Sequence, residues 1–399
     1  MFLVFLNDKL ISADSFAPLA LEVSKAFPGR KWRFFVFDKR TLDSIQANQQ
    51  IFGVLSSLGP IELFTDHRRS TRNEWTLYRL KFRLRALFFL AELILATLLF
   101  RPTLIHFRAL NTWPLKLLYL LNRRRTHIVQ PSTVGSNELE TRIERIVRRR
   151  KSRSISPAAS VIVHYDGTWD VLTDAVGSSA IRIQLPTPFS LPSWSALVKH
   201  TAAEAFQGIG VAPDEEVVAY MLNTMSSAEL LDEGSTFLEL FRQTLFILAQ
   251  ELPSLPIIVK RHPATSHGNS AAQDSIVREV TAATSHRIIF SNIHPQIVAT
   301  RARVFVSNWY SSTFQNALTM GVPTIQYTRC SRSVREQNQG RNIRPELVTH
   351  FFDGDEPRFR ACLAHTRPDR SHVDNTAKAD ARGRTDGLAA WIRELGSKT

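Results

Sequence analysis

The chain has 399 residues, a length that predicts two or three domains, each large enough to bury its own core. Hydrophobic residues make up 44% and charged residues 22% of the chain, which excludes the disordered and collagen-like classes. The two cysteines, Cys330 and Cys362, are too few for a disulfide framework or a multi-thiolate zinc site. They predict a chain that folds in the reducing cytoplasm.

The positive charge is concentrated in the N-terminal part. Residues 1–153 hold 27 Lys and Arg against 12 Asp and Glu, a net charge of +15. The remaining 246 residues hold 23 against 24, a net charge of −1. This asymmetry predicts contact with a polyanion or an anionic membrane surface. Nucleic acid is not expected as the partner, because the sequence has no zinc-ligand spacing, no aromatic RNA-binding signature and no basic region followed by heptads.

Strands and helices alternate through the first half of the chain. An apolar strand is predicted at residues 1–7, then helical spacing of apolar residues up to Phe27, then a second strand at 32–37. Further along, the pattern predicts helices near 77–100 and at 114–121, and strands at 103–107, 126–130 and 161–165. This order is typical of a parallel sheet covered by helices.

The most apolar stretch is Ala86–Phe100. It follows four basic residues, Arg79, Lys81, Arg83 and Arg85. The stretch contains Glu92 and is shorter than the roughly 20 residues that a bilayer-crossing helix needs, so we expect a buried core helix rather than a membrane span. The basic flank also predicts peripheral contact with anionic lipids.

A second alternating pattern follows a break in the chain. Pro186, Pro188 and Pro192 precede a helix at 193–207, and we place the domain boundary near residue 210. Beyond it, strands are predicted at 217–222, 256–260, 287–290, 304–306 and 323–327, and helices at 236–252, 271–283, 295–301 and 312–320. The prediction is an α/β protein of two Rossmann-like lobes, a basic N-terminal one (1–210) and a C-terminal one (211–399). A ligand cleft is expected between the carboxyl ends of their strands.

The first polar cluster at a predicted strand end is Lys260, Arg261, His262 and Pro263. The two cations provide a positive field, and the imidazole can donate a hydrogen bond to a phosphate oxygen or protonate a leaving group. Pro263 ends the strand and holds His262 at its tip. The alternative is a surface histidine beside a turn proline.

The second cluster follows the strand at 304–306 and contains Ser307, Ser311, Ser312 and Thr313. One of the last three hydroxyls is expected to cap the next helix, whose free N–H groups then form an anion site. The alternative is a plain N-cap serine. The pairing of this loop with His262 is what favours a phosphate site.

Two carboxylates are candidates for a general base. Asp166 lies at the end of the strand at 161–165, and Gly167 leaves room for an acceptor hydroxyl to approach it. The alternative for Asp166 is a turn residue. Asp232 is the rival base, and its alternative is an acidic N-terminus for the helix that follows.

The segments "IIVKRHP" (257–263) and "VFVSNWYSSTFQNALTMGVPTIQY" (304–327) resemble the paired His-Pro and Ser-Ser/Thr motifs of bacterial GT-B transferases that use cytidine-activated donors. These include sialyltransferases, capsule Kdo transferases and CDP-glycerol glycerophosphotransferases. "YDG" at 165–167 is similar to the motif that supplies the general base in the sialyltransferases, with Tyr165 where an acid is usual. The resemblance implies that His262 lies at the donor phosphate, that Ser311 and Ser312 contact it, and that Asp166 is the base.

The resemblance further implies an inverting, metal-independent glycosyltransferase without a cofactor, which takes a CMP-activated sugar of the sialic acid or Kdo type. Its C-terminal lobe binds the nucleotide sugar, and its basic N-terminal lobe binds an anionic glycan or glycolipid acceptor. Such an enzyme works in capsule or lipopolysaccharide synthesis, in the cytoplasm, at the inner face of the bacterial inner membrane. The alternatives are a CDP-glycerol glycerophosphotransferase or UDP-sugar transferase on the same fold, and a non-catalytic polyanion-binding or assembly protein.

Overall fold

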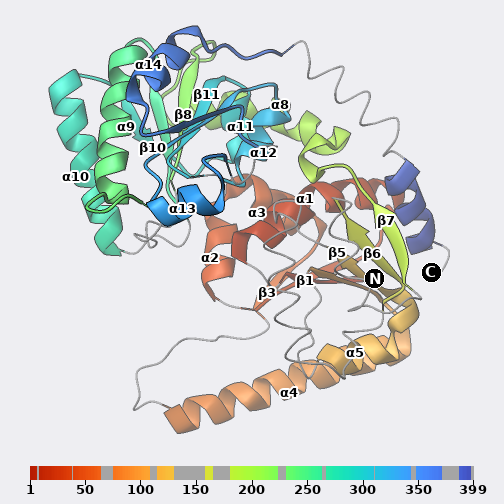
Figure 1. Ribbon diagram of the computed structural model, residues 1–399. Coiled ribbons are helices and arrows are strands. Elements are labelled where there is room, and N and C mark those ends of the chain that lie inside the picture. The colour runs from red at the N-terminus through yellow and green to blue at the C-terminus, as the bar shows by residue number, and fades with distance from the viewer. Residues whose placement is uncertain are drawn as a thin grey trace. The chain divides into compact units, whose positions relative to one another are not determined.

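The computed structural model describes residues 1–6, 9–37, 39–63, 75–107, 115–129, 158–164, 180–222, 231–262, 267–309, 311–342, 347–370 and 386–396. The chain divides into two compact units (Figure 1). The first comprises Met1–Trp194 and Ala379–Thr399, and the second comprises Ser195–Lys378. This division differs from the expected one at 1–210 and 211–399, because the boundary lies earlier and the C-terminal segment belongs to the first unit.

The first unit contains a seven-stranded parallel sheet with the order β3-β2-β1-β4-β5-β6-β7. Its strands are β1 (Phe2–Leu6), β2 (Trp32–Val36), β3 (Ile61–Leu63), β4 (Thr103–Phe107), β5 (Thr126–Val129), β6 (Ser160–Val163) and β7 (Ile181–Gln184). Every residue of β1 and β4 is buried, as expected for central strands covered on both faces.

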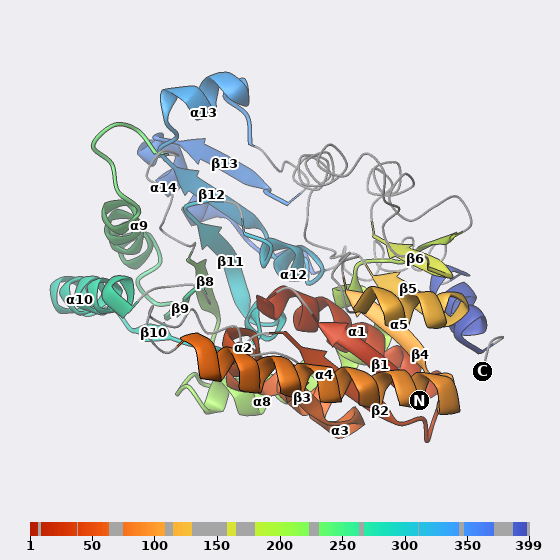
Figure 2. The same ribbon diagram turned by 90° about the horizontal axis from the view of Figure 1, so that it is seen from below.

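Helices cover both faces of this sheet. They are α1 (Lys9–Ala26), α2 (Lys39–Ala47), α3 (Gln49–Leu58), α4 (Trp75–Phe100) and α5 (Leu115–Leu121), with 3-10 turns η1 (Arg123–Arg125) and η2 (Pro188–Ser190). On one face, Phe16 of α1 packs against Trp32 and Phe34. On the other, Leu90 and Leu93 of α4 and Leu118 of α5 join a cluster with side chains of β1, β2 and β4. Helices α4 and α5 lie side by side on this second face (Figure 2).

The expected helix over the apolar stretch Ala86–Phe100 exists, but the expectation that it is buried is wrong. Only its inner side, with Leu90 and Leu93, is buried. Its outer side leaves Phe88 76% exposed and Phe100 69% exposed. The reason is positional, because α4 is the outermost layer on its face and meets the sheet along a single side. No helix in the described part of the chain is long and apolar enough to cross a membrane.

A helix over residues 386–396 completes the first unit and lies against β7. Trp391 and Leu395 are buried. A Cβ on Gly387 would overlap the carbonyl oxygen of Gln184, so this position accepts only glycine without a shift of the helix. The helix therefore protects an outer strand of the sheet, which explains why the C-terminal segment belongs to the first unit.

The second unit contains a six-stranded parallel sheet with the order β10-β9-β8-β11-β12-β13. Its strands are β8 (Val217–Met221), β9 (Ile257–Lys260), β10 (Ile288–Phe290), β11 (Ala302–Ser307), β12 (Thr324–Thr328) and β13 (His350–Asp353). Its helices are α9 (Phe237–Glu251), α10 (His267–Thr284), α11 (Pro295–Ala299), α12 (Phe314–Leu318), α13 (Arg332–Gln337) and α14 (Glu356–His365), and α8 (Pro192–Gln207) begins at the boundary between the units. The core packs α9 and α14 against the sheet.

Candidate functional site

The strand order of the second unit identifies the edge where a ligand binds. The chain builds β8, β9 and β10 in one direction and then returns to place β11 on the other side of β8. In open parallel sheets, ligands bind at the carboxyl ends of the strands where the order reverses in this way. The loops after β8 and β11 border that point, and the second predicted cluster lies in the loop after β11.

Strands β9, β8 and β11 end at the same level. Lys260 of β9 is in register with Met221 of β8, and Ser307 of β11 donates a hydrogen bond of 2.7 Å from its Oγ to the Met221 carbonyl. Neighbouring strands are about 4.8 Å apart, so the ends of β9 and β11 are separated by about 10 Å. His262, two residues past β9, and the Ser311 loop therefore leave the same edge within the span of one phosphate-bearing ligand.

Lys260 and Arg261 hold the loops around His262 in place. Lys260 Nζ donates to the carbonyls of Asn292 and Ile293 at 3.1 and 3.0 Å. Arg261 forms an ion pair with Asp274 and lies over the Phe290 ring, 3.7 Å from its centroid. The expected free positive field is thus reduced, because one of the two cations is already paired. The role of both residues in donor binding stays a prediction.

His262 itself is half-buried at the predicted strand tip, and Pro263 lies outside the described residues. The residue therefore lies at the carboxyl edge of the sheet, just past β9. Its catalytic role stays a prediction.

The loop after β11 differs from the expected helix cap. Helix α12 begins at Phe314 instead of residue 312, and Thr313 at its N-cap position makes no side-chain capping bond. The Oγ of Ser311 lies 2.8 Å from Thr313 Oγ1 and also accepts from the Thr313 N–H at 3.4 Å. The hydroxyls therefore bond within the turn. Ser311 and Ser312 remain half-buried, so a ligand at this edge can reach them.

A buried network beneath this loop was not expected from the sequence. The Tyr220 hydroxyl donates to Asn308 Oδ1, and Asn308 Nδ2 donates to Thr244 Oγ1 at 2.8 Å and to the Tyr327 carbonyl at 3.0 Å. Burial raises the pKa of Tyr220 well above its usual value, so it stays a neutral donor. The network joins β8, β11, β12 and α9 directly below the loop that carries Ser311. Its only sequence signal is an asparagine that follows an apolar strand.

Asp232 lies in an ion-pair network. Arg335 donates to its carboxylate at 2.8 Å and binds Asp353 at 2.7 and 3.1 Å. These two carboxylates, Asp353 first, raise the pKa of the Arg335 guanidinium. The ion pair with Arg335 gives Asp232 a structural contact beside α13, and its role as the rival base stays a prediction. Asp166 lies outside the described residues.

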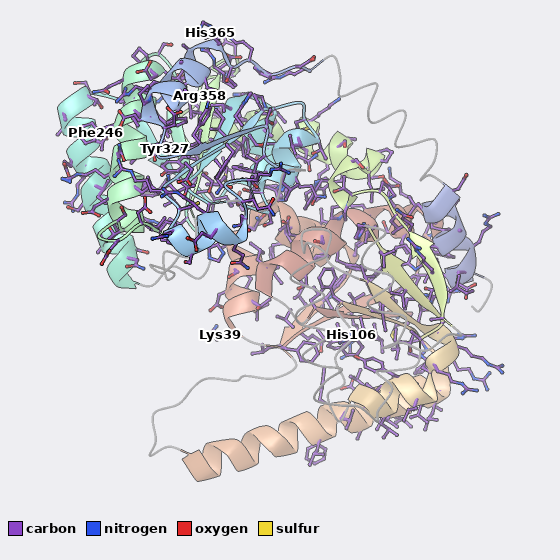
Figure 3. All side chains as sticks on the ribbon, viewed as in Figure 1. Lys39, His106, Phe246, Tyr327, Arg358 and His365 are labelled. Carbon is purple, nitrogen blue, oxygen red and sulfur yellow. The ribbon has the colours of Figure 1, made fainter. Side chains whose placement is uncertain are left out.

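A cavity of about 580 Å³ opens at the carboxyl edge of the same sheet. It lies where α9 begins and where the chain leaves β12. Arg329 donates to Gln243 Oε1 at 2.8 Å in its wall. Phe246 of α9, which is labelled in Figure 3, also lines the cavity. Its volume is within the range of small-molecule pockets. None of the residues predicted from the sequence lines this cavity.

Comparisons with known proteins agree on the fold alone. No family model matches the sequence, and no curated protein matches it significantly. Among solved structures, UDP-GlcNAc 2-epimerase from Methanocaldococcus jannaschii is similar over 93% of this chain and 94% of its own, with 12% identity and a TM-score of 0.55. The structure of LpCGTa in complex with UDP is similar over 99% of this chain and 98% of its own, with 10% identity and a TM-score of 0.54.

The wall teichoic acid polymerase TagF is also similar, over 98% of this chain and 87% of its own, with 11% identity and a TM-score of 0.51. At such identities, the likeness establishes architecture and leaves function to be argued from the site. The protein has the GT-B fold, with two parallel α/β units in one chain.

Proposed function

We propose that the protein is a glycosyltransferase whose nucleotide-sugar donor binds at the carboxyl edge of the second sheet. The observation that carries the proposal is the shared edge of β9 and β11. His262 follows one strand, and Ser311 and Ser312 follow the other, with β8 between them. An imidazole donor on one side of the carboxyl end of β8 and hydroxyl donors on the other suit the binding of a phosphate ester. The GT-B fold is also the fold of many glycosyltransferases.

In the proposed reaction, an acceptor hydroxyl attacks the anomeric carbon as the bond from that carbon to the phosphate oxygen breaks. The electron pair leaves on the phosphate, where hydrogen bonds from His262, Ser311 and Ser312 stabilise the growing charge. Asp166 takes the acceptor proton, and Asp232 is the alternative base. A single displacement inverts the configuration of the sugar and uses no metal ion.

For the donor, we propose a cytidine-linked sugar of the CMP-sialic acid or CMP-Kdo type, used in capsule or lipopolysaccharide synthesis. The "KRHP" and "SNWYSST" motifs support this choice. A UDP-sugar is the second candidate, because LpCGTa shares the fold and its structure contains UDP. Transfer of glycerol phosphate from CDP-glycerol is the third, since TagF, a wall teichoic acid polymerase, shares the fold.

For the acceptor, we propose an anionic glycan or glycolipid, and a peripheral location at the inner face of the bacterial inner membrane. The net charge of +15 in residues 1–153 supports both. A non-catalytic polyanion-binding protein would carry the same charge, so charge alone does not distinguish the two classes.

Nucleotide binding separates these candidates. Calorimetric titration of the full chain with CMP, CDP, UMP, UDP and GDP is expected to give the highest affinity for CMP or CDP. Tighter binding of UDP would favour the UDP-sugar transferase. Binding of heparin without binding of any nucleotide would contradict an enzyme and favour a polyanion-binding protein.

The assignment of His262 is tested by His262→Ala, with His200→Ala at an exposed position as the matched control. We expect the first variant to lose about 100-fold or more in turnover with an unchanged melting temperature, because it removes a hydrogen bond to the leaving phosphate. Near-normal turnover would contradict the donor site. Ser311→Ala/Ser312→Ala is expected to weaken nucleotide binding in part, whereas Ser333→Ala, an exposed serine, should not.

A further inference from the structure

An exposed apolar surface on the first unit is not explained by the transfer reaction. Ten large hydrophobic side chains are exposed among the described residues, and eight of them belong to α4 and α5. These eight, the α4–α5 apolar surface, are Leu87, Phe88, Leu95, Leu98, Leu99, Phe100, Leu120 and Leu121. Single exposed leucines are ordinary on any protein, but such a concentration indicates a binding surface.

The surface is a consequence of how α4 packs. Leu87, Leu95 and Leu98 recur at helical spacing and share one side of the helix. Leu90 and Leu93 on the opposite side are buried against the sheet. The helix cannot rotate to bury its outer side without exposing its inner one. Helix α5 packs on the same face of the sheet beside α4 (Figure 2). Its exposed leucines, Leu120 and Leu121, therefore extend the surface.

The outward side of α4 carries almost no charge over the residues whose side chains are described. Between Leu87 and Phe100 the only charged residue is Glu92. Arg33 Nη1 donates to its carboxylate at 2.7 Å, and the same guanidinium holds Glu62 at 2.8 and 2.9 Å. The one carboxylate at this surface is therefore ion-paired, and it shares the Arg33 guanidinium with Glu62.

Arginines lie at the C-terminal end of α4. Arg101 follows the helix, and Arg125 Nη1 donates to the Arg101 carbonyl at 2.7 Å. Asn122 Nδ2 donates to the carbonyl of Pro102. These bonds hold η1 against the end of α4 and bring the exposed Arg123 and Arg124 close to it. A basic cluster thus borders the apolar surface.

We propose that the α4–α5 apolar surface inserts into an anionic lipid bilayer, with Arg101, Arg123 and Arg124 at the lipid phosphates. Apolar side chains bordered by arginines match the acyl chains and headgroups of such a bilayer. A second copy of the chain would carry the same arginines, so charge complementarity favours lipid over self-association. The proposal names the contact that underlies the peripheral location proposed above. The membrane proposal can be tested separately from the proposed nucleotide-sugar site, because vesicle binding is measured without any nucleotide.

The test is co-sedimentation of the full chain with vesicles of phosphatidylcholine containing phosphatidylglycerol. The variant Leu95→Ser/Leu98→Ser/Leu99→Ser is expected to bind at least about tenfold more weakly than the native chain, because three apolar insertions are lost. The matched control is Ile181→Ser/Leu318→Ser, which changes the two exposed hydrophobics outside the surface. It should bind as the native chain does. Circular dichroism and melting curves check that each variant is folded.

Two further measurements separate insertion from the alternatives. Arg123→Gln/Arg124→Gln should weaken binding to anionic vesicles but leave binding to pure phosphatidylcholine unchanged. Part of the native binding should persist at high salt, because apolar insertion is not screened. Equal vesicle binding by the triple serine variant would overturn the proposal. If the native chain is also a dimer that this variant dissociates, the surface is an interface between two copies.

Discussion

Asn308 lies at the centre of the buried hydrogen-bond network beside the candidate site. Its amide bonds to Tyr220, Thr244 and the Tyr327 carbonyl, all of them buried, and joins three strands and one helix. The adjacent Ser307 bonds to β8 in the same region. These bonds fix the point at which the chain leaves β11 for the loop that carries Ser311.

We expect Asn308→Ala to lower the free energy of unfolding by about 3 kcal/mol, because it leaves buried polar partners unsatisfied. Chemical denaturation measures this change. Asn292→Ala, at an exposed position, is the control and should change stability by less than about 0.5 kcal/mol. Equal effects of the two substitutions would mean that the network contributes little to the fold.

Cys330 makes stability depend on alkaline pH. Burial, and then the charge of Asp353, raise the pKa of its thiol from 9.0 to about 12. Between these two values the folded chain keeps a proton that the unfolded chain loses. The contribution of the protonated Cys330 thiol to the free energy of unfolding is therefore complete below pH 9 and is lost as the pH rises through about 12.

The loss is at most about 1.4 kcal/mol for each pH unit in this window. Urea unfolding at pH 8 and pH 10 is expected to show a smaller loss of stability in Cys330→Ala than in the native chain. Cys362→Ala serves as the control and should lose as much stability between pH 8 and pH 10 as the native chain does. If Cys330→Ala retains it as well, other groups account for the alkaline sensitivity.

At the scale of elements, apolar runs identified the buried central strands of both sheets and one edge strand, β10, but missed the other three edge strands. The predicted strands at 1–7, 103–107 and 217–222 correspond to β1, β4 and β8. Strands β3, β7 and β13 were not predicted. They are short, and most of their residues are only half-buried, so they lack the continuous apolar run of a central strand. Their pairing partners, not their own sequences, make them strands.

The C-terminal helix provides a test at this scale. Gly387→Ala is expected to destabilise the chain by about 2 kcal/mol, because the new methyl overlaps the Gln184 carbonyl and displaces the helix from β7. The matched control is Gly53→Ala in the middle of α3, where a Cβ meets nothing within 4 Å. It should stabilise by up to about 1 kcal/mol. Melting curves of both variants distinguish steric overlap from a general effect of replacing glycine.

For the whole molecule, the separate hydrophobic cores of the two units predict separate thermal unfolding transitions. The cluster around β8, β11 and α9 lies within the second unit, and the cluster of α4, α5 and β1 lies within the first. Calorimetry is expected to resolve two transitions. Asn308→Ala should lower only one of them and Gly387→Ala only the other, since each residue contacts a single core. One transition that both variants lower equally would mean that the two units unfold as one.

The sequence by itself determined the α/β class, the central strands of both units and the loops that carry His262 and Ser311. These features follow from local apolar runs and from the residues that end them. Only the tertiary structure decided which strands are neighbours, and hence that the loops after β9 and β11 leave one edge on either side of β8. It also decided that Asp232 is paired with Arg335 and that one side of α4 stays exposed. Such features depend on contacts between residues far apart in the chain, and local sequence patterns do not predict those contacts.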